Sequence, residues 1–201
     1  MTDRQFAPTK EKILRVAARL FSMSGYNKVT TRQIAAAIGI NAASIYYHFK
    51  SKEEILESLY RFYADERLKY MPDLGELLLL AKDTPPHDVL MQSFFHYNED
   101  IREFLDQIVA TATLEIGTNK SSENFIRENI FESIANVHIP LIKHMEELGR
   151  IEPVDVDSYI TVLCYYCFSA ASLSKTVFGV GPDKYHVNLS YLLSMIKPID
   201  E

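Results

Sequence analysis

A short run near the N-terminus, residues 42–52 (AASIYYHFKSK), carries side chains that are able to hold nucleic acid. Hydroxyl, imidazole and ammonium groups bond to phosphates and base edges, and small residues let a helix backbone approach those edges closely. The alternative is burial of the aromatic residues in a core, but the run has too many polar tips for complete burial. The candidate contact residues in it are Ala42, Ala43, Ser44, Tyr46, Tyr47, His48, Lys50 and Lys52.

Two short helices with a tight turn between them are predicted to position this run. Thr30 and Gln33 have the spacing of a capping box, which begins a helix. Gly39 is expected to end that helix, because glycine adopts positive φ without strain. Asn41 is a favourable N-cap for a second helix over residues 42–48. A helix, a turn of three or four residues and a second helix is the arrangement of a DNA-binding helix-turn-helix.

Residues 30–56 resemble the DNA-binding domain of the tetracycline-repressor (TetR) family. The matching segments are TTRQIA (30–35), Gly39-Ile40, SIYYHF (44–49) and KSKEEIL (50–56), and residues 13–30 match the family's first helix and following loop. The resemblance implies that Thr31, Tyr46 and Lys52 hold phosphates. It also implies that the major groove is faced by Arg32, Ala43, Ser44, Tyr47 and His48. Thr30, Ala42 and Lys50 complete the candidate set.

The charge of the chain is unevenly divided. The net charge of −6 alone would argue against a nucleic-acid partner. Residues 1–52, however, hold nine Lys and Arg against two acids, giving +7, while residues 53–201 carry −13. This division confines the phosphate-attracting field to one end of the chain. We therefore expect a DNA-binding domain over residues 1–52 and a second domain over residues 53–201, linked by a helix over about residues 52–70.

The rest of the chain keeps a helical pattern, and no stretch alternates as a strand would. The sequence therefore predicts an all-α protein, with a three-helix helix-turn-helix domain and a larger helical domain for ligand binding and dimerisation. Beyond residue 70, helices are expected over residues 74–81, 87–98, 100–116, 122–148, 155–178 and 183–196.

The predicted helix over residues 155–178 is apolar on nearly all sides, and such a helix has to be covered on all sides. One of its stripes contains Ile160, Leu163 and Cys164. A four-helix bundle, formed with the 183–196 helix by two copies of the chain, would cover it. The resemblance implies the same homodimer, since family members pair through their last long helices. A buried helix in a monomer core is the alternative.

Aromatic residues are dense in the predicted larger domain. Each alone also fits a packed core, but together they could line an apolar pocket with a few polar tips. The resemblance implies such a pocket, holding a small-molecule inducer, and the scarcity of inward cations favours a lipophilic or aromatic one. The candidate ligand-binding residues are Tyr63, Arg67, Met91, Phe94, Phe95, Phe104, His138, Tyr165, Tyr166 and Phe168.

Catalysis and metal binding have little support in the sequence. Cys164 and Cys167 have the C-x-x-C spacing, but no strand precedes them and no second Cys/His pair is near, so core cysteines are the preferred interpretation. The chain has no phosphate-binding glycine loop, H-E-x-x-H motif or nucleophile elbow, so no enzyme activity, cofactor or metal is expected. No apolar run could span a membrane, and the N-terminus lacks a signal peptide, which predicts a cytoplasmic protein.

The predicted function is transcriptional regulation. A homodimer would bind a double-stranded DNA operator and leave it when a small-molecule inducer binds, which makes the protein a repressor. Two alternatives stay open. One is a constitutive DNA-binding protein without a ligand, and the other is a redox switch that uses Cys164 and Cys167.

Overall fold

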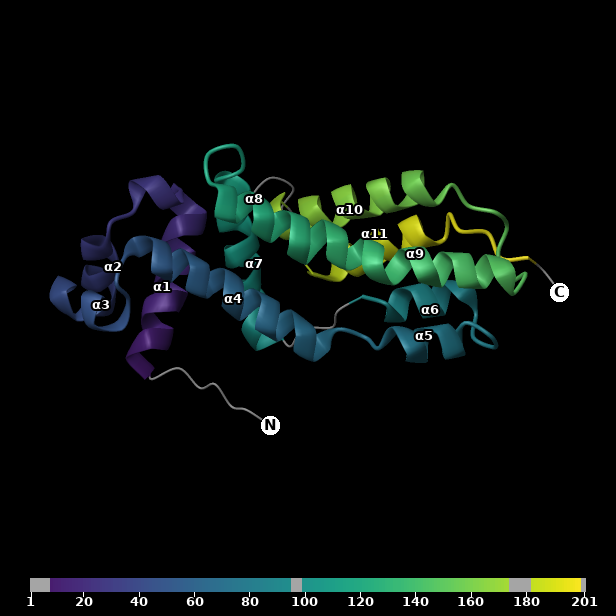
Figure 1. Cartoon of the computed structure of the whole chain (residues 1–201), viewed down its shortest axis with the longest axis horizontal. Helices are drawn as coiled ribbons and strands as arrows, with labels where there is room; N and C mark the ends of the chain where they lie inside the picture. The colour runs from purple at the N-terminus through teal and green to yellow at the C-terminus, as the bar shows by residue number, and fades with distance from the viewer. Residues whose placement is uncertain (1–7, 95–98, 174–181, 200–201) are drawn as a thin grey trace. The chain divides into compact units, whose positions relative to one another are not determined.

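The computed structural model describes residues 8–94, 99–173 and 182–199 (Figure 1). Regular structure in these ranges is helical, apart from one isolated β-bridge between Ile151 and Pro198. The predicted all-α class is therefore confirmed. In the same ranges, no helix is long and apolar enough to cross a membrane.

The helices follow one another with short connections. They are α1 (Pro8–Ser24), α2 (Thr31–Ile38), α3 (Ala42–His48), α4 (Lys52–Tyr70), α5 (Leu74–Leu80), α6 (Pro86–Gln92), α7 (Glu99–Leu114), α8 (Lys120–Ile126), α9 (Glu132–Glu147), α10 (Val156–Leu173) and α11 (Pro182–Leu193). A 3₁₀ turn, η1 (Tyr26–Lys28), precedes α2, and a π-helical turn, η2 (Arg127–Phe131), joins α8 to α9.

The chain packs as two compact units. The head unit contains residues 1–66 and 98–126, and the body unit contains residues 67–97 and 127–201. The head unit thus adds α7 and α8 to the N-terminal helices. This division describes packing, and the expected functional boundary at residue 52 stays a prediction.

The core of the head unit forms where α1 packs against α2 and along α7 (Figure 1). Ile13, Phe21 and Ile34 are fully buried there. A second cluster joins α4 to α8, where the Tyr60 ring stacks on Phe125 with centroids 4.4 Å apart. Burying these large side chains provides most of the favourable free energy that holds a unit of this size together.

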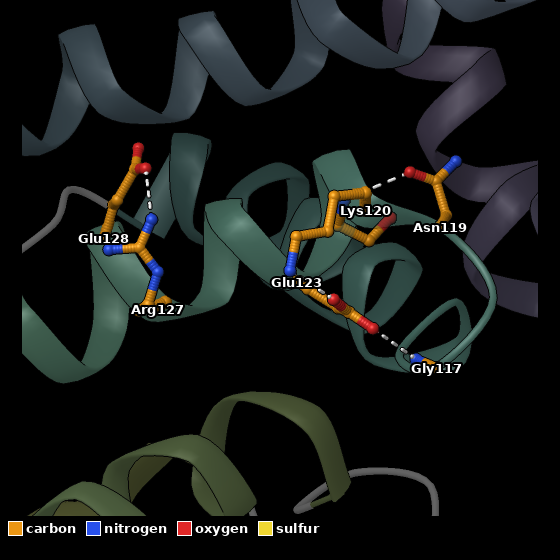
Figure 2. Close-up of polar contacts among 7 residues, drawn as sticks. Gly117, Asn119, Lys120, Glu123, Arg127 and Glu128 are labelled. Atoms are coloured by element: carbon orange, nitrogen blue, oxygen red, sulfur yellow. Dashed lines mark hydrogen bonds and ion pairs between the residues drawn. The ribbon is translucent and has the colours of Figure 1, made fainter.

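The corner between α7 and α8 is held by local polar contacts, which Figure 2 shows. Asn119 Oδ1 accepts a hydrogen bond from the backbone N–H of Ser122 at 3.2 Å, and therefore caps the start of α8. Glu123 accepts from the backbone N–H of Gly117 at 3.2 Å and pairs with Lys120 at 3.0 Å. These contacts keep the end of α7 in a defined conformation.

In the body unit, α9 lies between α10 and the α5–α6 pair, and α11 packs on α6 (Figure 1). His87 Nε2 lies 2.9 Å from Ser190 Oγ across the α6–α11 contact. Arg150, after α9, donates to the carbonyl oxygen of Thr84 at 3.2 Å. The residues expected to continue α10 to 178 lie partly outside the described ranges, which stop at 173 in this part of the chain.

Candidate nucleic-acid interface

A capping box holds the N-terminus of α2. Thr30 Oγ1 accepts a hydrogen bond from the backbone N–H of Gln33 at 3.3 Å, and Gln33 Oε1 accepts from the backbone N–H of Thr30 at 2.8 Å. The helix ends at Gly39, which has a φ of 72° in the left-handed region. Both predicted ends of this helix are confirmed.

The α3 helix is capped at its N-terminus and anchored along one face. Asn41 Oδ1 accepts from the backbone N–H of Ala43 at 2.9 Å, as predicted. Ile45 and Phe49 are buried and fix the helix against the head-unit core. Tyr46 and Tyr47 point the other way, with 56% and 87% of their surfaces exposed. A short helix that leaves two large tyrosines in solvent offers them to a partner.

Two of the three predicted phosphate-binding side chains meet. Thr31 Oγ1, at the first residue of α2, lies 3.2 Å from the hydroxyl of Tyr46 on α3. This hydrogen bond is on the surface, so a phosphate oxygen could approach both hydroxyls at once. The N-terminus of α2 is also the positive end of its helix dipole, which favours an anion at the same place.

Lys52, the third predicted phosphate contact, has partners within the protein. Its Nζ donates to the carbonyl oxygens of Tyr26 at 2.8 Å and Val29 at 3.0 Å, and lies 4.1 Å from the Tyr26 ring centroid. An ammonium group has three N–H donors, so one is left for a phosphate. In the free protein, the main role of Lys52 is to hold the turn that leads into α2.

The other candidate DNA contacts lie around these two helices. Thr30, Arg32, Ala43 and Lys50 are exposed, and Ala42, Ser44 and His48 are half-buried. The His48 ring meets the Tyr47 ring edge-on, with centroids 5.1 Å apart. Exposure allows a DNA contact without demonstrating one, so the role of each residue stays a prediction.

Sequence reasoning missed the polar contacts of the turn that precedes α2. Tyr26 donates its hydroxyl to Glu53 Oε2 at 2.7 Å, and burial together with this bond raises the pKa of the tyrosine. Glu115, from the end of α7, reaches the same turn. A tyrosine directly after Gly25 could have marked Tyr26 as an anchoring residue, whereas no local pattern pointed to Glu115.

The predicted ligand-binding residues are divided between the two units. Tyr63 and Phe104 lie in the head-unit core, where Tyr63 meets Phe125 edge-on and Phe104 contacts Phe62. Met91, Phe94 and His138 lie in the body unit, as do Tyr165, Tyr166 and Phe168 on α10. Arg67, also in the body unit, donates to Ser133 Oγ. Phe95 lies outside the described residues.

His138 is a satisfied core residue. It is 2% exposed, and its Nε2 and Nδ1 lie 3.0 Å from Ser93 Oγ and 3.1 Å from the Tyr159 hydroxyl. Burial lowers the pKa of His138 to about 3, so the imidazole is neutral at physiological pH. Both ring nitrogens are used, which leaves none for a ligand in this conformation.

A surface groove of about 370 Å³ runs between α9 and α10. Its lining residues are Phe131, Glu132, Ala135, Ile160, Thr161, Cys164 and Tyr165. Of the predicted ligand-binding residues, Tyr165 is the one that lines it. The groove has a mostly apolar wall and a carboxylate at its edge, a combination that suits an apolar or amphipathic small molecule.

The cysteines of α10 have little redox character. Cys164 is 6% exposed, and its Sγ lies 3.8 Å from the carbonyl oxygen of Phe131. Burial raises the pKa of the Cys164 thiol to about 11, so the reactive thiolate is scarce at neutral pH. Neither cysteine forms a disulfide bond. In the described part of the chain, no group of three His, Cys, Asp or Glu side chains could hold a metal ion.

Comparisons with known proteins agree with the geometry of the head unit. Residues 13–59 match the family described as bacterial regulatory proteins, tetR family. The chain is 30% identical over 176 residues to IcaR, the negative transcriptional regulator of the biofilm operon icaADBC in Staphylococcus epidermidis. That match covers 87% of this chain and 89% of IcaR. The chain belongs to the tetR family.

Two further comparisons show how much of the chain resembles known proteins. YerO of Bacillus subtilis, an HTH-type transcriptional regulator, is 34% identical over 120 residues, which are 60% of this chain and 37% of YerO. The chain thus spans about a third of the length of that relative. A Saccharomonospora viridis regulator solved with choline has the same fold, with a TM-score of 0.64, 19% identity and coverage of 96% and 98% of the two chains. Both curated relatives are named as transcriptional regulators.

Proposed function

We propose that the protein is a dimeric repressor that docks α3 in the major groove of an operator and leaves it when a small molecule binds. The single observation that carries the proposal is the outward face of α3. Tyr46 and Tyr47 are exposed on this face, and the hydrogen bond between Tyr46 and Thr31 at the N-terminus of α2 supports our candidate phosphate contact. The name of IcaR, a negative regulator, supports repression as the direction of control.

The charge distribution supports the same orientation on DNA. Residues 1–52 carry +7 in a chain with a net charge of −6, so attraction to phosphates is concentrated in this N-terminal segment. Neutralising phosphates releases counterions, and binding should therefore weaken steeply as salt is added. Ala42 and Ala43 offer methyl groups in place of hydrogen-bond donors, which favours readout of thymine methyls and groove shape at those positions. Binding to a chromosomal operator would require the protein to act in the cytoplasm.

Apolar surface on the last two helices supports a homodimer. Val162 and Tyr165 on α10, and Tyr191 and Met195 on and just after α11, are between 51% and 77% exposed. Exposed apolar side chains on these two helices favour a four-helix contact with a second copy. A two-fold dimer could set its recognition helices about 34 Å apart, which is one turn of DNA.

The groove between α9 and α10 is our candidate for the inducer site. Its volume of about 370 Å³ would hold a small molecule, and its aromatic and aliphatic lining favours a lipophilic or aromatic one. A protein of this fold has been solved with choline, which supports the view that the fold holds small ligands. The ligand would act by binding two conformers with different affinities. In the conformer that it prefers, the spacing of the two recognition helices would no longer match the helical repeat of the DNA.

Paired tyrosine substitutions test the DNA-binding part. Tyr46→Phe removes a predicted phosphate contact and should weaken binding by about three- to tenfold on all duplexes alike. Tyr47→Phe removes a predicted base contact and should weaken binding on some sequences more than on others. Fluorescence anisotropy on a set of duplexes, which includes the region upstream of the gene, measures both. A sequence-selective loss for Tyr46→Phe would show that its hydroxyl does not contact a phosphate.

A thermal-shift screen tests the ligand-responsive part. Lipophilic and aromatic compounds should raise the unfolding temperature of the wild type, because a ligand that binds only the folded state stabilises it. Ala135→Phe, which fills the groove, should remove that shift while leaving DNA binding intact. A screen with no stabilising compound would favour the alternative of a constitutive DNA-binding protein.

A further inference from the structure

Glu115 is a buried carboxylate, 4% exposed, just after the end of α7. Its Oε1 accepts a hydrogen bond from the backbone N–H of Tyr26 at 2.9 Å. Its Oε2 accepts from the side-chain amide of Asn27 at 3.0 Å and from the hydroxyl of Thr118 at 3.3 Å. These donors are neutral, so hydrogen bonds compensate the loss of hydration of the carboxylate. Tyr26 is 89 positions away in the sequence.

The turn that Glu115 holds is clamped at its other end by Lys52. The carboxylate binds a backbone N–H at the start of η1, whereas the Lys52 ammonium binds the carbonyl oxygens of Tyr26 and Val29. The negative carboxylate therefore lies at a backbone N–H group of the turn, and the positive ammonium lies at its carbonyl oxygens. Both placements are electrostatically favourable. Gly25, with a φ of 84°, leads into the turn, and a Cβ there would lie 3.4 Å from Glu115 Oε1.

The clamp determines where α2 begins. Val29 is followed by Thr30, the N-cap of α2, and then by Thr31, which meets Tyr46 at the predicted phosphate position. A displacement of the turn would therefore move the N-terminus of α2 relative to α3. The side chain that fixes the turn comes from α7, outside the helix-turn-helix segment.

We infer that Glu115 is a positioning residue for DNA binding: from the end of α7, its carboxylate fixes the Tyr26–Val29 turn and so the phosphate-contacting start of α2. This role rests on the proposed DNA binding. Glu115 acts through the turn and touches no DNA itself. Its removal should weaken DNA binding more than an equal loss of stability elsewhere in the head unit would.

Full-length Glu115→Ala and Glu115→Gln test this role. Ser122→Ala is the matched control, because it removes another buried hydrogen bond of the head unit, the 2.7 Å bond between Tyr60 and Ser122, which includes no atom of the Tyr26–Val29 turn. The measurements are the Kd for a duplex from upstream of the gene, hydrogen–deuterium exchange of peptides covering residues 25–31, and thermal unfolding. Glu115→Gln keeps one acceptor oxygen and remains informative if Glu115→Ala does not fold.

We expect Glu115→Ala to raise the Kd about tenfold or more and to accelerate exchange at residues 25–31, with a smaller effect of Glu115→Gln. Ser122→Ala should lower the unfolding temperature and leave both the Kd and that exchange unchanged. If the wild type binds DNA and the Glu115 variants bind it as tightly as Ser122→Ala does, the positioning role is wrong and the proposed DNA binding stands. If the wild type shows no salt-sensitive binding to any duplex, the proposed function fails and this role fails with it.

Discussion

The stability of the body unit should depend on pH through His138. Ser93 Oγ donates its hydrogen to the carbonyl oxygen of Leu90 at 2.6 Å, so it must accept from His138 Nε2–H. His138 Nδ1 is then the acceptor, and the Tyr159 hydroxyl donates to it at 3.1 Å. Protonating Nδ1 would put a second donor against that hydroxyl at a buried site. This arrangement is consistent with a pKa for His138 of about 3.

The size of the effect follows from the difference between the two states. An unfolded histidine has a pKa of about 6.5, so between that pH and about 3 the unfolded chain binds a proton that the folded chain does not. The contribution of a neutral His138 is therefore complete above pH 6.5 and decreases as the pH falls. Each unit below 6.5 removes up to about 1.4 kcal/mol, or about 2 to 3 kcal/mol by pH 4.5.

Urea unfolding of the wild type and of His138→Gln, at steps from pH 7 to pH 4.5, measures this contribution. The glutamine amide can replace the Nε2–H donor but does not titrate, so the free energy of unfolding of the variant should fall less steeply. The other ionisable groups are common to both proteins and cancel in the difference. Parallel curves for the two proteins would refute a buried neutral imidazole, and would return His138 to the list of accessible ligand-binding candidates.

Other substitutions test the remaining structural claims. Asn41→Ala removes the cap of α3 and should lower the free energy of unfolding by about 1 kcal/mol in urea titrations; an unchanged value would mean that the cap is not formed. Gly39→Ala should cost about 1 kcal/mol through its φ of 72° alone, since no atom lies within 4 Å of the added Cβ; a neutral result would place the residue outside the left-handed region. Val162→Glu should give a monomer in light scattering, whereas Leu79→Glu on exposed α5 should not; a dimer in both would exclude the α10 face. Cys164→Ser should leave DNA affinity under oxidant the same as in the wild type, and a difference would restore the redox-switch alternative.

The helix-turn-helix could be predicted because its signals are local. Thr30, Gln33, Gly39 and Asn41 each act on backbone groups within a few residues, so their types and spacing are enough to set the ends of α2 and α3. Local spacing also explains why the buried face of α3 was predicted correctly: Ile45 is buried, and Tyr46 next to it is exposed. Predicting these helices required no knowledge of long-range packing.

The ligand site could not be predicted in the same way. Aromatic residues have the same helical spacing whether they line a pocket or fill a core. Of the predicted set, Tyr63 and Phe104 are buried in the head unit and His138 in the body unit. The apolar stripe expected at a dimer contact shows the same ambiguity, since Leu163 and Cys164 are buried within one chain. Periodicity indicates that a face is covered, but does not identify what covers it.

The carboxylate that enters the Tyr26 turn from α7 limits how far this regulator can be divided into interchangeable parts. A chimera that grafts residues 1–66 onto the effector-sensing portion of another regulator would inherit the basic surface and both recognition tyrosines. It would lack the Glu115 acceptor, unless the new host supplied an acidic side chain at the same corner. Engineers who exchange such modules to build hybrid biosensors should therefore transplant residues 98–126 together with the N-terminal segment.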